Sequence, residues 1–517
     1  MPHTANESEY TTMPATTARP RTRPQPESRK PAAPAPPPAS GLVRHALEGA
    51  GSGLCAVAAM AAVAALALTL LDAGSVGSLW SMTMAVTAGA VGGSLSASAE
   101  MSGGLGSAAS GLAGLFSGGS GGDMGPSLSG AADVTPLGVT LVGSVVLWLV
   151  FSRRLRRRRV DATDLTVRAV GAAAAAWLAL LVVAEFAHGK VTLPTSAMGA
   201  LGGGPGSGTS GDSGAGGLMD SLLGSGAAGK LSMTYDVSAG AVAGGALLWV
   251  GIVLGVGCLI SPLALLPLGG VLDRLRSAWK PSLSALVRTL LVLAAPLMVL
   301  SAFVGTVAGG RAATGAGAAL LLAPNALAIF LTTGVGSAWT AGAHPVQSDG
   351  RGGLSGLMGA IGGGNQPFGS QTDRTEHLRS LSAGGWPLWL VALTVTGIIL
   401  LGCAWAAART AQPAHTLPLH PYRGRRARRL GMAERFGLVT AVVMGTLAWV
   451  AGASGNFAIS IFGSEMGGMR AELSGGVLSA VALGLLVGGL AGSVGSLLPA
   501  RRGEGASRKG VRESSSR

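Results

Sequence analysis

The sequence predicts an all-α polytopic membrane protein, folded as a bundle of transmembrane helices. Only 12% of its 517 residues are charged, 48% are hydrophobic, and the mean hydropathy is +0.50. Several uncharged apolar runs reach about 18 residues or more, which is the length a helix needs to cross the hydrocarbon core of a bilayer. This composition is atypical of a soluble globular domain.

The first 40 residues are predicted to lie outside the bundle. Region 1–40 holds 10 of the 26 prolines and no apolar core, so we expect a disordered cytoplasmic tail. Region 500–517 is predicted to be a second disordered, basic, cytoplasmic tail. The first apolar run begins near Leu54, too far from the start for a cleavable signal peptide, so it is expected to stay as a membrane anchor.

Eight strong apolar runs are predicted to span the membrane, and two weaker ones, 76–98 and 313–336, are predicted not to cross. With these spans, 30 of the 37 Lys and Arg lie on one side. The positive-inside rule then predicts a plasma-membrane protein with both termini cytoplasmic. If both weak segments crossed, the arginine cluster that begins at Arg153 would lie outside. The predicted spans are 54–71, 134–151, 169–187, 237–260, 289–308, 386–408, 436–453 and 473–498.

The chain is predicted to consist of two tandem four-span repeats, 41–262 and 284–499. Leu42-Val43-Arg44 precedes the first span just as Leu286-Val287-Arg288 precedes the fifth, and the order of spans, weak segments and loops agrees in both halves. An even number of spans in each repeat predicts a parallel orientation about an axis along the membrane normal. The alternative is coincidence in a low-complexity alphabet.

The two weak segments form the candidate permeation or ligand site. Interrupted apolar segments at corresponding positions of two halves are typical of transporter sites, because irregular backbone at membrane depth must line a cavity or be buried in protein. A pair of ordinary helices under the outer loops is the favoured alternative. The candidate residues are Ser81, Thr83, Thr87, Pro324, Asn325, Thr332 and Thr333.

Four polar residues are predicted at the outer interface: Glu185, Asp236, Asn456 and Glu472. The span interiors contain no ionisable residue. Asp236 and Glu472 are interpreted as helix-start residues, because the amino-terminal end of a helix stabilises a negative charge. Cation binding is the alternative.

Catalytic residues, a cofactor and a metal site are not predicted. The three cysteines, Cys55, Cys258 and Cys403, are far apart, and the histidines lack zinc-ligand spacing. The near match to a phosphate-binding loop before Lys230 fails at Leu231, so no nucleotide is expected. Arg-rich loops beside span ends are explained by topology, which predicts anionic lipid headgroups rather than nucleic acid as their partner.

GxxxG-type spacings in the fourth and eighth spans predict close helix packing. The contact between the two halves is the favoured interpretation, and a homo-oligomer face is the alternative. The residues are Gly240, Gly244, Gly251 and Gly255 in one span, and Gly484, Gly488 and Gly492 in the other.

The sequence combines four features: a Pro-rich basic tail, about eight Ala/Gly/Val/Leu spans, Gly-Ser outer loops and Arg-rich inner loops. In this architecture the chain resembles the streptophobe family, hydrophobic multi-pass proteins of streptomycetes, over residues 41 to about 500. The resemblance implies a multi-pass membrane protein and no particular catalytic residues. The expected function is a non-enzymatic structural or accessory envelope protein; the alternative is a permease or channel for a neutral or weakly polar solute, with its path between the repeats.

Overall fold

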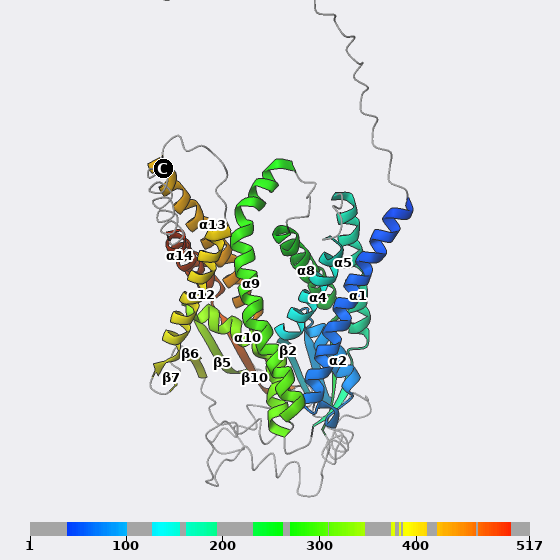
Figure 1. The fold of residues 1–517 in the computed structure, drawn as a ribbon. Coiled ribbons are helices and arrows are strands. Elements are labelled where there is room, and N and C mark those ends of the chain that lie inside the picture. Colours follow the sequence, from blue (N-terminus) through cyan, green and yellow to red (C-terminus); the bar gives the residue numbers. More distant parts are fainter. Residues whose placement is uncertain are drawn as a thin grey trace, which may run out of the picture.

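The computed structural model describes residues 39–100, 127–155, 162–193, 231–261, 269–308, 310–346, 374–377, 382–383, 386–410, 421–461 and 464–497. The predicted tails therefore lie almost wholly outside the described residues. Helices pack side by side over most of the molecule, and a β-sheet lies at one end of them (Figure 1).

The described residues of the amino-terminal half form five α-helices, one short 3₁₀ turn and four strands. In chain order they are α1 (Ala39–Leu70), the short 3₁₀ turn η1 (Ala73–Ser75), α2 (Leu79–Gly89), β1 (Leu95–Glu100), β2 (Ser127–Val134), α4 (Leu137–Leu155), α5 (Ala162–Glu185), β3 (Gly189–Leu193), β4 (Leu231–Val237) and α8 (Ala239–Ile260).

The carboxy-terminal half follows a closely similar order. Its elements are α9 (Gly269–Ala308), α10 (Gly310–Val335), β5 (Trp339–Val346), β6 (Arg374–His377), the short pair β7 (Ser382–Ala383) and β8 (Trp386–Pro387), α12 (Leu388–Thr410), α13 (Pro421–Val450), β9 (Ala453–Ile461), β10 (Ser464–Gly475) and α14 (Val477–Gly495).

Eight described helices are long and apolar enough to cross a membrane, which supports a multi-pass membrane protein. Seven of them coincide with predicted spans. The eighth is α10, which covers the segment predicted not to cross. In the predicted span 134–151 the apolar helix is shorter, Leu137–Arg153, because Val134 ends strand β2.

The sequence analysis did not predict the eight-stranded sheet that adjoins the helices. Its strand order is β3-β4-β1-β2-β9-β10-β5-β6, and all its neighbours are antiparallel. The first four strands come from one half of the chain and the last four from the other. Strands β2 and β9 join the halves in continuous register from Ser127↔Ser460 to Val134↔Ala453.

The sheet has one mainly apolar face and one mainly polar face, because successive side chains of a strand point to opposite sides. On β4, Tyr235 and Val237 are buried, whereas Thr234 and Asp236 are exposed. The apolar face packs on the helices: Trp339 is 1% exposed in a cluster with Ala328, Ala448 and Ala480.

Each half has a helix beside the apolar face of the sheet, α2 in the first and α10 in the second (Figure 1). Both helices are followed within three residues by a glycine with positive φ, 95° at Gly92 and 108° at Gly336, a conformation glycine adopts without steric cost. Immediately afterwards, the Ser94 carbonyl accepts from the N–H of Ser238, and the Ala338 carbonyl accepts from that of Gly476. The chain leaves both helices in the same way.

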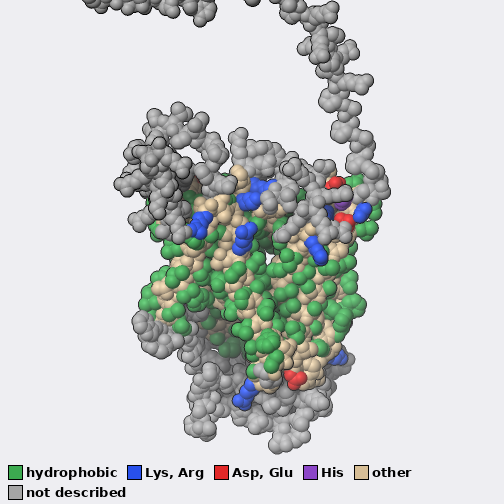
Figure 2. Space-filling view, viewed as in Figure 1, with side chains coloured by type: hydrophobic (Ala, Val, Ile, Leu, Met, Phe, Trp, Pro, Cys, Tyr) green, Lys and Arg blue, Asp and Glu red, His purple; other side chains and the backbone are tan. Residues whose placement is uncertain are grey.

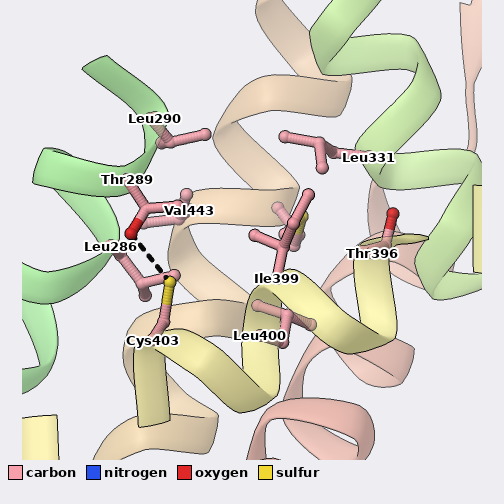
Figure 3. Close-up of a pocket in the computed structure, with 10 residues that line it drawn as sticks. Leu286, Thr289, Leu290, Leu331, Thr396, Ile399, Leu400, Cys403 and Val443 are labelled. Atoms are coloured by element: carbon pink, nitrogen blue, oxygen red, sulfur yellow. Dashed lines mark hydrogen bonds between the residues drawn. The ribbon is translucent and has the colours of Figure 1, made fainter. Parts of the chain in front are cut away.

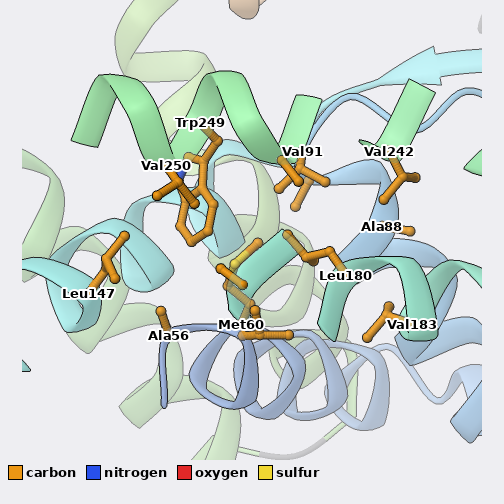
Figure 4. Close-up of a cluster of buried hydrophobic side chains, with 14 of the residues drawn as sticks. Ala56, Met60, Ala88, Val91, Leu147, Leu180, Val183, Val242, Trp249 and Val250 are labelled. Atoms are coloured by element: carbon orange, nitrogen blue, oxygen red, sulfur yellow. The ribbon is translucent and has the colours of Figure 1, made fainter. Parts of the chain in front are cut away.

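The first half has a close-packed apolar core where α1, α2, α4, α5 and α8 meet (Figure 4). Met60, Leu147 and Leu180 are fully buried in it. Trp249 lies in the same cluster, and its indole N–H donates to the Ser144 hydroxyl at 2.9 Å, so the buried polar group is satisfied. The second half is centred on Phe436, Leu400 and other buried side chains of α9, α10, α12 and α13.

Lys and Arg side chains gather near the end of the bundle away from the sheet (Figure 2). Helices α4, α8, α12 and α14 begin within a few residues after a strand, and α5 and α13 end just before one. The sheet therefore lies at one end of these helices, and the chain passes from the sheet end to the basic end repeatedly.

Candidate functional site

The helices α2 and α10 are bonded to the sheet through buried aromatic side chains. The Tyr235 hydroxyl of β4 donates to the Ser81 hydroxyl of α2 at 2.8 Å. The Trp339 indole N–H of β5 donates to the Thr332 hydroxyl of α10 at 2.9 Å. Two of the candidate permeation residues therefore hold the sheet against the helices.

Two of the other hydroxyls of this candidate site bond within their own helix. Thr83 donates to the carbonyl of Leu79 and Thr87 to that of Thr83, both at 2.7 Å within α2. The Thr333 hydroxyl oxygen is buried without a hydrogen-bond partner among the described residues. The structure places Ser81, Thr83 and Thr87 on α2. The other candidate permeation residues lie on α10, so the predicted site is divided between two helices.

Asn325 joins the two halves of the chain. Its Oδ1 accepts from the N–H of Leu137 at 2.9 Å, and its Nδ2 donates to the carbonyl of Thr135 at 2.8 Å. The Thr135 hydroxyl in turn donates to the carbonyl of Val450, at the end of α13. The side chain is 7% exposed, so it binds the β2–α4 connection inside the protein.

Pro324 interrupts the backbone hydrogen bonds of α10 at the place where α4 packs against it. Proline has no N–H, so the Leu320 carbonyl four residues earlier lacks its usual helical donor. Gly138, in the first turn of α4, lies against this carbonyl; a Cβ on Gly138 would be 2.0 Å from the Leu320 oxygen. The interruption in α10 is therefore a packing contact between the halves.

The predicted helix-start role of Asp236 and Glu472 is wrong. Asp236 lies in β4 and Glu472 in β10. The N-cap of α8 is Ser238, whose hydroxyl accepts from the N–H of Ala241, and the N-cap of α14 is Gly476. Alternation of polar and apolar residues continues up to each helix and keeps these acids in strands.

Three of the four predicted outer-interface residues lie on the polar face of the sheet. One row of that face runs across the strands through the pairs Asp236↔Ser96, Ser96↔Ala131, Ala131↔Asn456, Asn456↔Arg470 and Arg470↔His344. Glu472 lies in the adjacent row, opposite Ser454. Glu185 ends α5 and is not in the sheet.

Hydroxyls on the polar face bond across the strands. Ser98 and Thr234 share a hydrogen bond at 2.9 Å, as do Thr340 and Ser474 at 3.1 Å. At the junction of the halves, Asn456 Oδ1 accepts from the N–H of Ala131 at 3.0 Å. Among the described residues, no three His, Cys, Asp or Glu side chains are arranged to hold a metal ion.

The sequence analysis did not predict the strands that carry these polar residues, because the strands are rich in Ala, Ser and Gly, which are weak β-formers. One signal was present in the sequence. Residues 231–237, Leu-Ser-Met-Thr-Tyr-Asp-Val, alternate strictly between apolar and polar side chains, the pattern of a half-buried strand.

A small cavity lies in the second half, between α9, α10, α12 and α13 (Figure 3). Its volume is about 10 Å³, close to the size of one water molecule. Leu286, Leu331 and Ile399 are among its lining residues, and the nearby Cys403 thiol donates to the Thr289 hydroxyl at 3.1 Å. An apolar cavity of this size is a packing defect rather than a solute site.

The glycines of the predicted helix contact do not join the halves within the chain. Gly484, Gly488 and Gly492 pack on Thr440, Phe436 and neighbouring residues of α13, in their own half. A Cβ on Gly240, Gly244, Gly251 or Gly255 would meet no atom of the described residues within 4 Å. This set instead lies on a face of α8 without described neighbours, and the contacts between the halves include those of α10 with α1 and α4, of α9 with α8, and of β2 with β9.

No protein-family model, curated protein or solved structure matches this chain.

Proposed function

We propose that the protein is a non-enzymatic accessory or structural protein of the plasma membrane, which holds a polar β-sheet surface on the outer side. The observation that carries this proposal is the eight-stranded sheet itself, with its polar face exposed and its apolar face fixed to the helices. A sheet built by both halves of a membrane-anchored chain is a stable surface for contacts outside the bilayer.

The proposed orientation places both termini in the cytoplasm and the sheet outside. Its support is the gathering of Lys and Arg at the end away from the sheet (Figure 2), because basic residues are retained on the cytoplasmic side. In this orientation α2 and α10 do not cross the membrane. Figure 1 shows α10 beside the sheet, and it leads directly from the end of α9 into β5.

The two halves are proposed to be tandem, parallel repeats. Support comes from the strand order, since β3-β4-β1-β2 and β9-β10-β5-β6 place corresponding strands in the same sequence. The matching bonds from Ser238 to Ser94 and from Gly476 to Ala338 support it further. Membership of the streptophobe family is proposed on the architecture described from the sequence.

An accessory role is favoured over a permease by the contacts at the candidate site. Asn325, Ser81 and Thr332 are engaged in bonds that hold elements together, and the described cavity is small and apolar. A permease would require a polar path between the halves.

Cysteine labelling tests the orientation. In a background in which Cys55, Cys258 and Cys403 are replaced, single cysteines at the exposed Ser98 and Ser454 should react in intact cells with an impermeant thiol reagent. A cysteine at the exposed Thr163, near the basic end, should react only after permeabilisation. The reverse pattern would overturn the proposed orientation.

A solute-flux measurement tests the role. Proteoliposomes with the purified protein should show no faster entry of glycerol or other neutral solutes than vesicles without protein. Flux that rises with protein content, and that is lost in Asn325→Leu, would establish the permease instead.

A further inference from the structure

The amino-terminal part of α9 carries the three cations Arg276, Lys280 and Arg288. Arg276 and Lys280 are four residues apart on this helix, about one turn, and Arg288 lies eight residues further along it. The Arg276 guanidinium donates to the carbonyl of Ser261, at the end of α8. Like charges one turn apart on a helix repel, and an anion bound beside Arg276 and Lys280 relieves this repulsion.

Lys280 and Arg288 form no ion pair with a described acidic side chain within 4 Å. The other half provides an internal comparison. Arg44 follows Leu42-Val43 in α1 as Arg288 follows Leu286-Val287 in α9, and it pairs with Glu48 at 3.4 Å, four residues later. In α9 the residue four positions after Arg288 is Val292. Arg288 therefore lacks the acidic residue four positions later that Arg44 has.

The face of α9 that carries Arg288 continues as an apolar track. Val292, Val299 and Phe303 follow at spacings that keep them on one side of the helix, and they are 69%, 69% and 65% exposed. From Val292 to Phe303 the helix rises about 17 Å, roughly half the ~30 Å hydrocarbon thickness of a bilayer. The track therefore matches the depth of one lipid leaflet below the cations.

We propose that Lys280 and Arg288, with Arg276 beside them, bind the phosphate of an anionic phospholipid whose acyl chain lies along Val292, Val299 and Phe303. Charge complementarity selects the headgroup, and the exposed apolar track accommodates the chain. This goes beyond the general attraction of basic loops for anionic lipids, because it assigns one binding site to one half of the chain. It rests on the proposed topology to place this end of α9 at a bilayer surface, and on the proposed repeat for the comparison with Arg44.

Thermal unfolding in lipid nanodiscs tests the site. The full-length protein is compared in phosphatidylcholine alone and in phosphatidylcholine mixed with phosphatidylglycerol. Phosphatidylglycerol should raise the Tm by at least about 2 °C, since a ligand that binds only the folded state stabilises it. The double variant Lys280→Gln/Arg288→Gln should lose most of this rise and retain less phosphatidylglycerol on purification.

Arg44→Gln is the matched control, because it removes a cation at the corresponding position of the first half. It should keep the phosphatidylglycerol effect. An equal loss in Arg44→Gln, or an unchanged effect in the double variant, would overturn the site. A rise of the same size with inorganic phosphate in phosphatidylcholine nanodiscs would show a free-anion site and overturn the lipid assignment. The bilayer faces of a nanodisc are equivalent, so none of these outcomes reports on the proposed orientation.

Discussion

The indole N–H of Trp339 donates to the hydroxyl of Thr332 at 2.9 Å, and this single bond ties the sheet of the second half to α10. The Thr332 hydroxyl also donates to the Ala328 carbonyl at 2.7 Å, one turn earlier in the helix. Both side chains are essentially buried, at 1% and 0% exposure. The sheet and the helix are therefore joined where water cannot replace a lost partner.

Thr332→Val should destabilise the protein by about 1–3 kcal/mol, because the substitution leaves the Trp339 indole N–H buried without an acceptor. The measurement is the free energy of unfolding, or the Tm, of the detergent-solubilised protein. Thr333→Val is the control: the Thr333 hydroxyl has no described partner, so its removal should cost nothing or stabilise slightly. Equal losses in the two variants would contradict the role of the Trp339–Thr332 bond.

Asn325→Leu should cost about 2–4 kcal/mol, because it leaves the Leu137 N–H and the Thr135 carbonyl without their partner at the contact of the two halves. Asn325→Asp should cost at least as much, because a buried carboxylate still accepts from Leu137 but faces the Thr135 carbonyl oxygen without a hydrogen to donate. The exposed Asn456 makes one bond to Ala131, and Asn456→Ala should cost at most about 1 kcal/mol. Unfolding monitored by tryptophan fluorescence would rank the three variants.

Gly245→Ala and Gly240→Ala should differ sharply although both lie in α8. A Cβ on Gly245 would be 1.7 Å from the Val91 carbonyl oxygen, so α8 would have to move away from the end of α2. A Cβ on Gly240 meets no atom of the described residues, so the gain in helix propensity should stabilise by up to about 1 kcal/mol. Tm and folded yield measure the difference, and a Tm loss in Gly240→Ala would instead indicate a contact with a second copy.

Thr396→Val should stabilise the second half by up to about 1–2 kcal/mol. The Thr396 side chain is 1% exposed beside the small cavity, and its hydroxyl has no partner among the described residues. The replacement has nearly the same shape and removes an unsatisfied polar group. Thr289→Val is the comparison, because Thr289 accepts from the Cys403 thiol and should show no such gain. A lower Tm for Thr396→Val would mean that its hydroxyl has a partner after all.

The sequence by itself determined the class of the protein and the position of most helices. An uncharged apolar run of membrane length can bond all its own backbone groups inside a bilayer only as a helix. Seven of the eight predicted spans accordingly coincide with long apolar helices. It also predicted the correspondence of the Leu42–Arg44 and Leu286–Arg288 segments, because short matches and element order are local features; this correspondence stays a prediction.

Only the tertiary structure decided the sheet and the roles of the candidate residues. Strand pairing joins residues as distant as Ala131 and Asn456, and weak β-formers such as Ala, Ser and Gly give little local signal. Asn325 could be recognised as polar and interrupting from the sequence. Its side chain forms hydrogen bonds with the β2–α4 connection. These bonds depend on which backbone groups the fold places beside Asn325, and those groups come from the other half of the chain.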